Sequence, residues 1–277
     1  MLRFLYHTAP GRLLLRPLTS RFVSRLCGRF MDSAASRVLI HPFVRRNGID
    51  LSEYENASYS CFNDFFTRRI RPELRPVDPD PEALIAPCDG LLSAYPLDDD
   101  RILPIKQSFY TLSTLLRDPD LSTRYRNGLC LVFRLCVNHY HRYCYPDSGG
   151  KGENVFLPGR LHTVRPVALE ARPVFIENCR EYTVLSTDHF GSVVQMEVGA
   201  LLVGKIHNCH GAEPIRRGEE KGMFLYGGST VILLLEEGRA VLRPELLAAT
   251  RRGEETPVRM GERLGLAVSQ AKIESSL

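Results

Sequence analysis

The sequence lacks closely paired cysteines, although it contains eight cysteines in all. No two of them form a Cys-x-x-Cys pair, and a chain of 277 residues is too long to need disulfide staples. No cleavable signal sequence is in view. We therefore expect reduced thiols in a cytosolic compartment.

An apolar run of the ~20 residues that a membrane-spanning helix needs is also missing. The first 31 residues contain six arginines and no Asp or Glu. Apolar residues recur there at helical spacing: Leu15, Leu18, Phe22, Leu26 and Phe30. This pattern is typical of a helix that lies in a membrane interface, with its arginines directed toward lipid phosphates. A helix packed on its own domain and an Arg-rich mitochondrial transit peptide are the alternatives.

The chain has little excess charge of either sign. Its 36 basic and 32 acidic residues give a net charge of +4, which is too small to indicate nucleic-acid binding. The hydrophobic content of 44% is enough to bury one sizeable core in a chain of this length. We expect one main domain with an appendage and no nucleic acid among the partners.

The pattern of residues changes about a quarter of the way along the chain. A short helix is predicted in the stretch Ser60–Phe66, which Thr67-Arg68-Arg69 follows, with Ser60 or Asn63 as its cap. After the Pro-rich segment 71–81, short runs of Val, Leu, Ile and Tyr are bounded by Gly, Pro and Asp, which predicts strands, and only 110–117 looks helical. We predict an α+β fold: a helical, membrane-docking region over 1–70, and a β-rich catalytic domain over 71–277 with a mainly antiparallel, sandwich-like core.

The segment FLYGGSTVILLLEEG, residues 224–238, places two glycines and two hydroxyl residues at the start of an apolar strand. Gly228 has no side chain to shield its carbonyl from the Ser229 hydroxyl. If a base removes the hydroxyl proton, an N-to-O acyl shift gives an ester, and β-elimination then cuts the chain and leaves a residue that hydrolyses to a pyruvoyl group. A tight turn ahead of a buried strand is the alternative interpretation of these four residues alone.

Several segments in fixed order resemble the phosphatidylserine decarboxylase proenzyme family. GEEKGMFLYGGSTVILLL is similar to the family's self-processing region, and RLCVNHYHRYCYPDSG falls where the family has an Asp-Tyr-His-Arg-x-His segment. The other similar segments are FNDFFTR with Arg75-Pro76, APCDG at 86–90, Ile105-Lys106 with Tyr110-Thr111-Leu112, and VGALLVG at 198–204. The resemblance covers nearly the whole chain.

The resemblance implies a role for each matching residue. Ser229 would be the nucleophile of self-cleavage and the source of the pyruvoyl cofactor, and Gly228 would become the new C-terminus. The products would be a β chain of residues 1–228 and an α chain of residues 229–277. Asp89 matches the processing aspartate, which is suited to orient an imidazole. His141 is the expected proton-transfer residue, because an imidazole titrates near neutral pH.

Two positions depart from the family pattern. Cys144 stands where many relatives carry a second histidine, and His139 stands where an Asp is usual. His141 would then serve both cleavage and decarboxylation, or recruit His139 or Cys144 as an auxiliary group; on one strand His139 and His141 would share a face. A zinc site is a rival use of Cys136, His139, His141 and Cys144 with His207, Cys209 and His210, but the spacings match no compact zinc motif, and we expect no metal.

The activity implied by the resemblance is decarboxylation of phosphatidylserine to phosphatidylethanolamine and CO₂, through a Schiff base between the substrate amine and the pyruvoyl group. The expected partners are phosphatidylserine in an anionic membrane and the β chain with the α chain; a homodimer is an open alternative. The expected location is peripheral, on the cytoplasmic face of a bacterial cell membrane, and mitochondrial targeting is less favoured. Two other functions stay open: a lipid-binding relative that does not process itself, and a pyruvoyl decarboxylase of a soluble amino acid.

Overall fold

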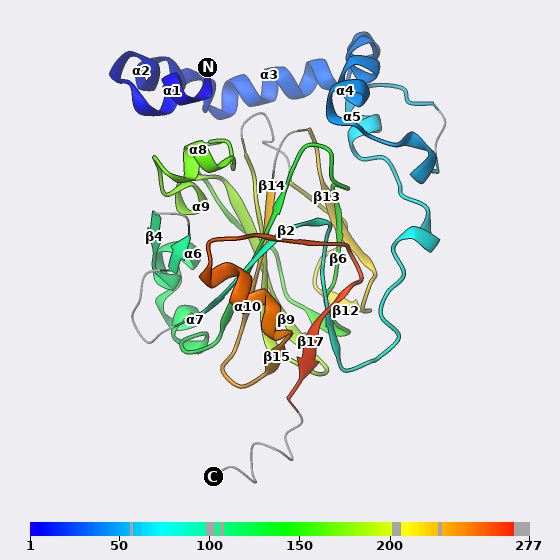
Figure 1. Cartoon of the computed structure of the whole chain (residues 1–277), viewed down its shortest axis with the longest axis vertical. Coiled ribbons are helices and arrows are strands. Elements are labelled where there is room, and N and C mark those ends of the chain that lie inside the picture. The colour runs from blue at the N-terminus through cyan, green and yellow to red at the C-terminus, as the bar shows by residue number, and fades with distance from the viewer. Residues whose placement is uncertain (56–57, 98–102, 106–107, 201–205, 227–228, 269–277) are drawn as a thin grey trace.

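The computed structural model describes residues 1–55, 58–97, 103–105, 108–200, 206–226 and 229–268. A long antiparallel sheet forms the centre, short helices and two small sheets cover its faces, and the N-terminal helices lie across one end of it (Figure 1). The α+β class and the antiparallel sheets are as predicted from the sequence.

The N-terminal region contains five α-helices and two 3₁₀ turns among its described residues. These are α1 (Leu2–His7), α2 (Ala9–Leu18), α3 (Arg21–Met31), η1 (Ala34–Leu39), α4 (Ile40–Asn47), η2 (Leu51–Glu53) and α5 (Phe62–Phe66). The Thr8 and Ser20 side chains cap α2 and α3 by accepting hydrogen bonds from backbone N–H groups of the first turns. Within the described ranges, no helix is both long and apolar enough to cross a bilayer.

The apolar row expected on one N-terminal helix is divided between two helices. Because Ser20 starts a new helix, Leu15 and Leu18 belong to α2, whereas Phe22, Leu26 and Phe30 belong to α3. Leu15 is buried in the main core, but Phe22 and Leu26 are 77% and 59% exposed. The region therefore packs on the domain through one face and presents apolar side chains to solvent on another.

The central sheet has nine strands in the described part of the chain, with β14 near its middle. Its order is β12 (Glu213–Ile215), β7 (Gly149–Lys151), β9 (Arg180–Thr187), β10 (Gly191–Val198), β14 (Ser229–Leu235), β5 (Leu129–Leu135), β2 (Gly90–Pro96) and β16 (Thr256–Val258), with β8 (Val155–Leu157) also paired to β9. All seven residues of β14 are buried because β10 and β5 flank it and both faces of the sheet are covered.

Alternate residues of β14 enter two different cores. Ile232 and Leu234 pack with the first core, and Val231 and Leu233 pack with the second. The helices that contribute to the first core are α1, α2, α6 (Leu112–Leu116), α7 (Pro119–Arg124), α8 (Pro166–Leu169) and α9 (Val174–Glu177). The second core lies under α10 (Pro244–Arg251) and two three-stranded sheets: β1 (Ala83–Ile85), β17 (Arg263–Ala267) and β15 (Ala240–Leu242), and β11 (Ile206–Asn208), β13 (Glu220–Phe224) and β6 (Arg142–Cys144). A separate hairpin pairs β3 (Leu103–Ile105) with β4 (Ser108–Tyr110).

The prediction that only 110–117 is helical within the β domain is wrong. The structure has α6 (Leu112–Leu116) there, and also α7 (Pro119–Arg124), α8 (Pro166–Leu169), α9 (Val174–Glu177) and α10, besides η3 (Pro72–Leu74) ahead of the first strand. These helices have four to eight residues, too few to establish a helical period in the sequence. Proline at the first helical position of α7, α8 and α10 was the available signal.

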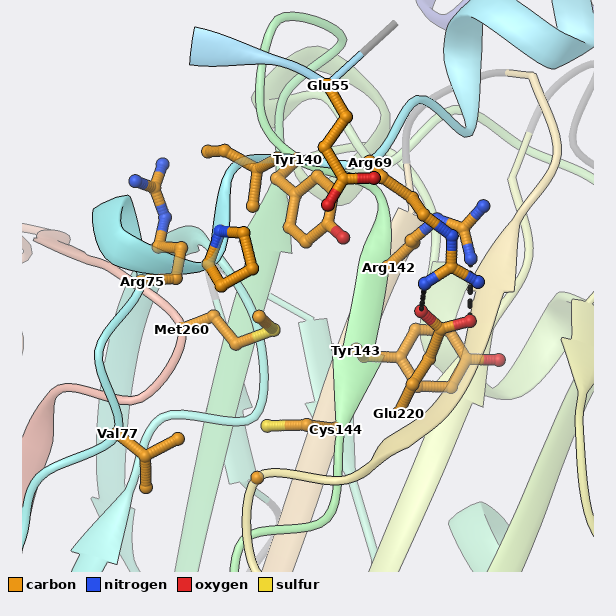
Figure 2. A pocket seen from close by; sticks show the side chains of 13 residues that line it. Glu55, Arg69, Arg75, Val77, Tyr140, Arg142, Tyr143, Cys144, Glu220 and Met260 are labelled. Atoms are coloured by element: carbon orange, nitrogen blue, oxygen red, sulfur yellow. Dashed lines mark hydrogen bonds and ion pairs between the residues drawn. The ribbon is translucent and has the colours of Figure 1, made fainter.

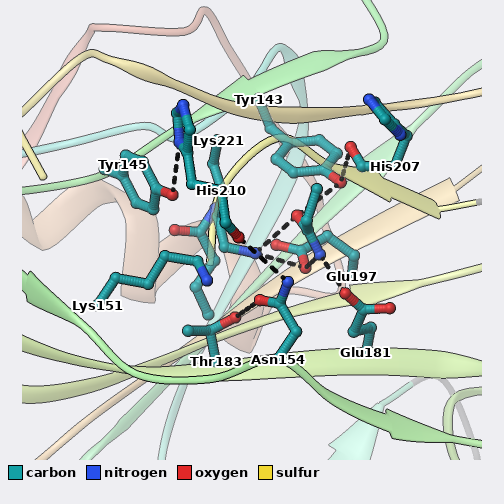
Figure 3. Close-up of polar contacts among 12 residues, drawn as sticks. Tyr143, Tyr145, Lys151, Asn154, Glu181, Thr183, Glu197, His207, His210 and Lys221 are labelled. Atoms are coloured by element: carbon teal, nitrogen blue, oxygen red, sulfur yellow. Dashed lines mark hydrogen bonds and ion pairs between the residues drawn. The ribbon is translucent and has the colours of Figure 1, made fainter. Parts of the chain in front are cut away.

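A buried ion pair joins the central sheet to the sheet that contains β13. Lys221 on β13 and Glu197 on β10 are both fully buried, and Lys221 Nζ lies 2.7 Å from Glu197 Oε2 (Figure 3). Lys221 Nζ also donates to Asn208 Oδ1 at 3.0 Å, and Asn208 Nδ2 donates to Glu181 Oε1 at 2.7 Å. Removing one partner of such a pair would leave a buried charge unpaired, so the network fixes β13 against β10.

Candidate active site

Ser229 is the first residue of β14 and is fully buried. Its partner in the strand register is Leu135, the last residue of β5, so it sits where two strands of the central sheet end. Gly228, the other half of the predicted cleavage site, lies outside the described residues.

The side chains of His141 and Ser229 lie next to each other. The Ser229 Oγ atom lies 3.4 Å from His141 Nδ1, and the other ring nitrogen, Nε2, lies 3.1 Å from the backbone carbonyl oxygen of Cys136. A carbonyl oxygen only accepts hydrogen bonds, so Nε2 carries the ring proton and Nδ1 of the neutral ring has a free lone pair. The serine hydroxyl therefore faces an atom that can accept its proton.

The surroundings of His141 favour the neutral imidazole. The ring is fully buried and stacks on Phe66, with centroids 4.1 Å apart. Burial, followed by the positive charge of Arg68, holds the pKa of His141 well below its usual range. His141 is thus unprotonated at neutral pH, as a general base must be.

Asp89 lies on another side of the site and binds an arginine. Its carboxylate oxygens accept hydrogen bonds from Arg75 Nε at 2.7 Å and Nη2 at 2.6 Å, and Oδ1 also accepts from the Met260 backbone N–H at 2.9 Å. The acceptor that orients the His141 imidazole is the Cys136 carbonyl, a role that the sequence analysis assigned to Asp89. The negative charge of Asp89 acts instead on His139, where it partly offsets the lowering of the pKa by burial.

The two departures from the family pattern occupy different environments. His139 lies in the turn between β5 and β6, so it does not share a strand with His141, and its Nδ1 accepts from the Cys136 backbone N–H at 3.1 Å. Cys144 is buried on β6, and burial raises the pKa of its thiol to about 12. A thiol with this pKa is protonated at neutral pH and is a poor proton acceptor.

A pocket of about 320 Å³ opens between the segment 69–77, with Glu55, and strand β6 (Figure 2). Arg75, Tyr140, Cys144 and Glu220 are among the residues that line it, whereas Ser229 and His141 are not. The pocket therefore lies beside the Asp89–Arg75 pair and not at the serine. In the part of the chain that the structure describes, no three His, Cys, Asp or Glu side chains are grouped to hold a metal ion.

Sequence reasoning missed three contributors to the site. Phe66 lies under the imidazole, the Cys136 carbonyl sets the tautomer, and Arg75 holds Asp89. The FFTR segment contains Phe66, and the Arg75-Pro76 pair contains Arg75. Their membership in these family-like segments was the signal available for both residues. The helix cap at Ser60 or Asn63 is also wrong, because Cys61 is the N-cap residue of α5 and the Asn63 side chain bonds elsewhere.

A serine hydroxyl beside the nitrogen of a buried, unprotonated imidazole is the arrangement that nucleophilic catalysis requires. Residues 62–266 match the family model described as phosphatidylserine decarboxylase. The chain is 44% identical to phosphatidylserine decarboxylase proenzyme 2 of Clostridium acetobutylicum, over 95% of this chain and 91% of that protein. It is 39% identical to the phosphatidylserine decarboxylase proenzymes of Desulfitobacterium hafniense strain Y51 and Ruminiclostridium cellulolyticum, over 96% and 98% of this chain and 91% and 92% of those proteins. The chain belongs to the phosphatidylserine decarboxylase family.

Proposed function

We propose that the protein is a phosphatidylserine decarboxylase that makes its own pyruvoyl group by cutting between Gly228 and Ser229. The observation that carries the proposal is the pairing of Ser229 Oγ with the unprotonated Nδ1 of His141, within a chain similar to proteins named as proenzymes. The products are a β chain of residues 1–228 and an α chain of residues 229–277.

The residues at the site can drive this cut. His141 Nδ1 takes the hydroxyl proton while Ser229 Oγ attacks the Gly228 carbonyl carbon; the C–N bond breaks, the freed amine is protonated, and an ester remains. Loss of the Ser229 Cα proton then expels Gly228 as a carboxylate. The dehydroalanine left at position 229 becomes an imine, which water hydrolyses to the pyruvoyl group and ammonia. Burial of Ser229 and His141 keeps bulk water from competing with the hydroxyl during the first step.

The site also fits a pyruvoyl group once it has formed. Its carbonyl supplies an electron sink for decarboxylation of an amino acid. His141 stays next to position 229 after the cut, because Cys136 and Phe66, which hold the ring, are distant from the cut bond in sequence. The same imidazole is therefore placed to return a proton to the substrate, without a second histidine at position 144.

Asp89 is assigned an electrostatic part in cleavage. Its carboxylate keeps Arg75 and the Met260 segment in place and faces His139, so it shapes the charge near the site without bonding the His141 ring. His139 remains the auxiliary candidate, since it is half-buried and its Nδ1 bonds the residue whose carbonyl holds His141.

The N-terminal helices are assigned a membrane-docking role at the cytoplasmic face of the cell membrane. Phe22, Leu26 and Phe30 on α3 are exposed, and Arg25 and Arg29 on the same helix are exposed beside them. Apolar side chains with interleaved arginines suit a surface of anionic lipid, where the substrate resides. This placement disfavours a soluble amino acid as substrate, and the intact Ser229–His141 pair disfavours a lipid-binding relative that does not process itself.

Mass spectrometry of the purified protein tests the proposal. We expect two fragments, 1–228 and 229–277, with a pyruvoyl group in place of an amine at the start of the smaller one. Ser229→Ala should give one uncut chain without decarboxylase activity, because the attacking oxygen is gone. A wild-type chain that stays whole, with a free serine hydroxyl after incubation with lipid, would contradict the proposal.

A further inference from the structure

The side chain of Asn63 lies between helix α3 and the segment that precedes Ser229. Its Oδ1 accepts a hydrogen bond from the backbone N–H of Tyr226 at 3.1 Å, and its Nδ2 donates to Asp32 Oδ1 at 2.7 Å. Asn63 is only 5% exposed. The chemistry of the two neighbours fixes the orientation of the amide, because a backbone N–H needs an acceptor and a carboxylate needs a donor.

Tyr226 is three residues before Ser229, and both are held to the rest of the protein. Asn63 holds the backbone of Tyr226, and pairing with β5 and β10 holds β14 from Ser229 onward. The Tyr226 ring also packs on Phe62 and Phe66, with centroid distances of 4.8 and 5.3 Å. Tyr226 and Ser229, the described residues on either side of the predicted cut, are therefore both anchored, and the chain between them is called the connection below.

Helix α5 brings this connection and the base together. Phe66, which packs on Tyr226, also stacks on the His141 ring, so one helix contacts both a residue ahead of the predicted cut and the proposed base. Asn63 belongs to the same helix and supplies the hydrogen bond to the connection. A displacement of a catalytic geometry by about 1 Å can lower a rate by roughly 10²-fold, so this support bears on the rate of cleavage.

The other bond of Asn63 reaches the end of α3. Asp32 is the C-cap residue of that helix, and the nearby Ser36 Oγ accepts a hydrogen bond from the Phe62 backbone N–H at 2.8 Å. The helix with exposed Phe22 and Leu26 is thus tied by polar contacts to the helix that holds the connection.

We propose that Asn63 is a positioning residue for self-cleavage, which holds the Tyr226 backbone and transmits its position from Asp32 at the end of α3. The inference rests on the proposed self-cleavage at Ser229. Asn63 touches neither reacting atom; it acts through the placement of the chain ahead of Ser229.

Exchanging the two side chains provides the test. Asn63→Asp keeps an acceptor for the Tyr226 N–H but sets a carboxylate against Asp32, so we expect cleavage to slow about tenfold or more, the effect of one buried hydrogen bond on a barrier. Asp32→Asn keeps an oxygen for Asn63 Nδ2 and should cut at nearly the wild-type rate. The double variant Asn63→Asp with Asp32→Asn restores one donor and one acceptor, and should return to within about threefold of wild type.

Two further measurements separate positioning from general support of the fold. Each variant is also made with Ser229→Ala, and its thermal unfolding shows whether the uncut chain is folded. Decarboxylation per cut molecule is then measured after long incubation; a positioning role predicts slow cutting with nearly normal turnover once cut. A purely structural role predicts that the melting temperature falls while folded molecules cut at the wild-type rate.

The outcomes distinguish this inference from the function on which it rests. A wild-type chain that cuts, together with a folded Asn63→Leu variant that lacks the acceptor for the Tyr226 N–H and still cuts equally fast, overturns the role of Asn63 and leaves the proposed function standing. A double variant as slow as Asn63→Asp overturns the link to Asp32. A wild-type chain that never cuts overturns the proposed function, and this inference with it.

Discussion

Replacing Asp89 by Asn tests whether its ion pair with Arg75 supports the fold of the site. The carboxylate makes two hydrogen bonds to the guanidinium, at 2.7 and 2.6 Å, and both side chains are 9% exposed. In the Asp89→Asn variant the amide nitrogen would replace Oδ2, because Oδ1 already accepts from Arg75 Nε and the Met260 N–H. A donor would then face the Arg75 Nη2 donor, and the guanidinium would lose its counter-charge.

The expected cost follows from burial of the pair. Breaking a buried ion pair by changing one partner costs about 3–5 kcal/mol. At roughly 2–4 °C per kcal/mol for a chain somewhat smaller than this one, the melting temperature should fall by about 6–20 °C. Cleavage should slow as well, because Asp89 is the proposed processing aspartate.

The assay uses the uncut Ser229→Ala chain, so that every sample is one polypeptide. Asp89→Asn and a matched control, Glu254→Gln, are compared with this parent by thermal denaturation. Glu254 also pairs with an arginine, Arg252 at 2.7 Å, but both side chains are more than half exposed, and the control should melt with the parent. If Asp89→Asn melts together with Glu254→Gln, the buried pair does not support the fold.

Three further predictions concern the base, the thiol and the helix surface. His141→Ala should slow cleavage roughly 10²-fold or more. In the wild type the cleavage rate should stay level at neutral pH and fall only well below the usual imidazole pKa of about 6.5. The folded state also loses stability as the pH falls below about 6.5, because His141 has a lower pKa in the folded than in the unfolded chain. A rate that already falls as the pH drops toward 7 would contradict a neutral, buried His141. Cys144→Ser should keep both cleavage and decarboxylation, since burial keeps its thiol protonated at neutral pH; an uncut variant with a native circular dichroism spectrum would contradict this. Phe22→Ser with Leu26→Ser should weaken binding to anionic liposomes, measured by sedimentation, by roughly 100-fold or more, at about 1.5–3 kcal/mol for each apolar side chain that enters the bilayer. Val241→Ser, at a residue 65% exposed on β15, is the control, and an equal loss in both would exclude a specific docking face.

The sequence predicted the parts of this protein that depend on local pattern and on the family resemblance. The strand that begins at Ser229, the antiparallel sheets and the meeting of Ser229 with His141 are all found in the structure. These features have strong signals, because a run of five apolar residues after Gly-Gly-Ser-Thr defines a strand and its start.

The remaining parts depend on contacts between distant segments. The group that binds the His141 ring is the backbone carbonyl of Cys136, which every residue type has, so the sequence could not indicate this contact. Asp89 and Arg75 are 14 residues apart, and nothing in either segment indicates that the guanidinium, and not an imidazole, binds the carboxylate. The apolar residues from Leu15 to Phe30 lie on two helices, and not on one, because the Ser20 side chain caps the start of α3. The regular apolar spacing continues across this cap and so gave no sign of the break.

The place of β14 in the sheet determines what cleavage would do to the molecule as a whole. The strand pairs with β10 through six residues and with β5 through seven, and both partners belong to residues 1–228. The small fragment would therefore remain in the middle of the large fragment's sheet, and the two fragments could separate only if the hydrogen bonds of β14 to both β10 and β5 were broken. The cut protein would be a heterodimer whose subunits cannot fold independently, so its unfolding becomes a dissociation and its melting temperature rises with protein concentration. Cleavage of one peptide bond would thus change folding from a reaction within one chain into a reaction that needs two chains to associate.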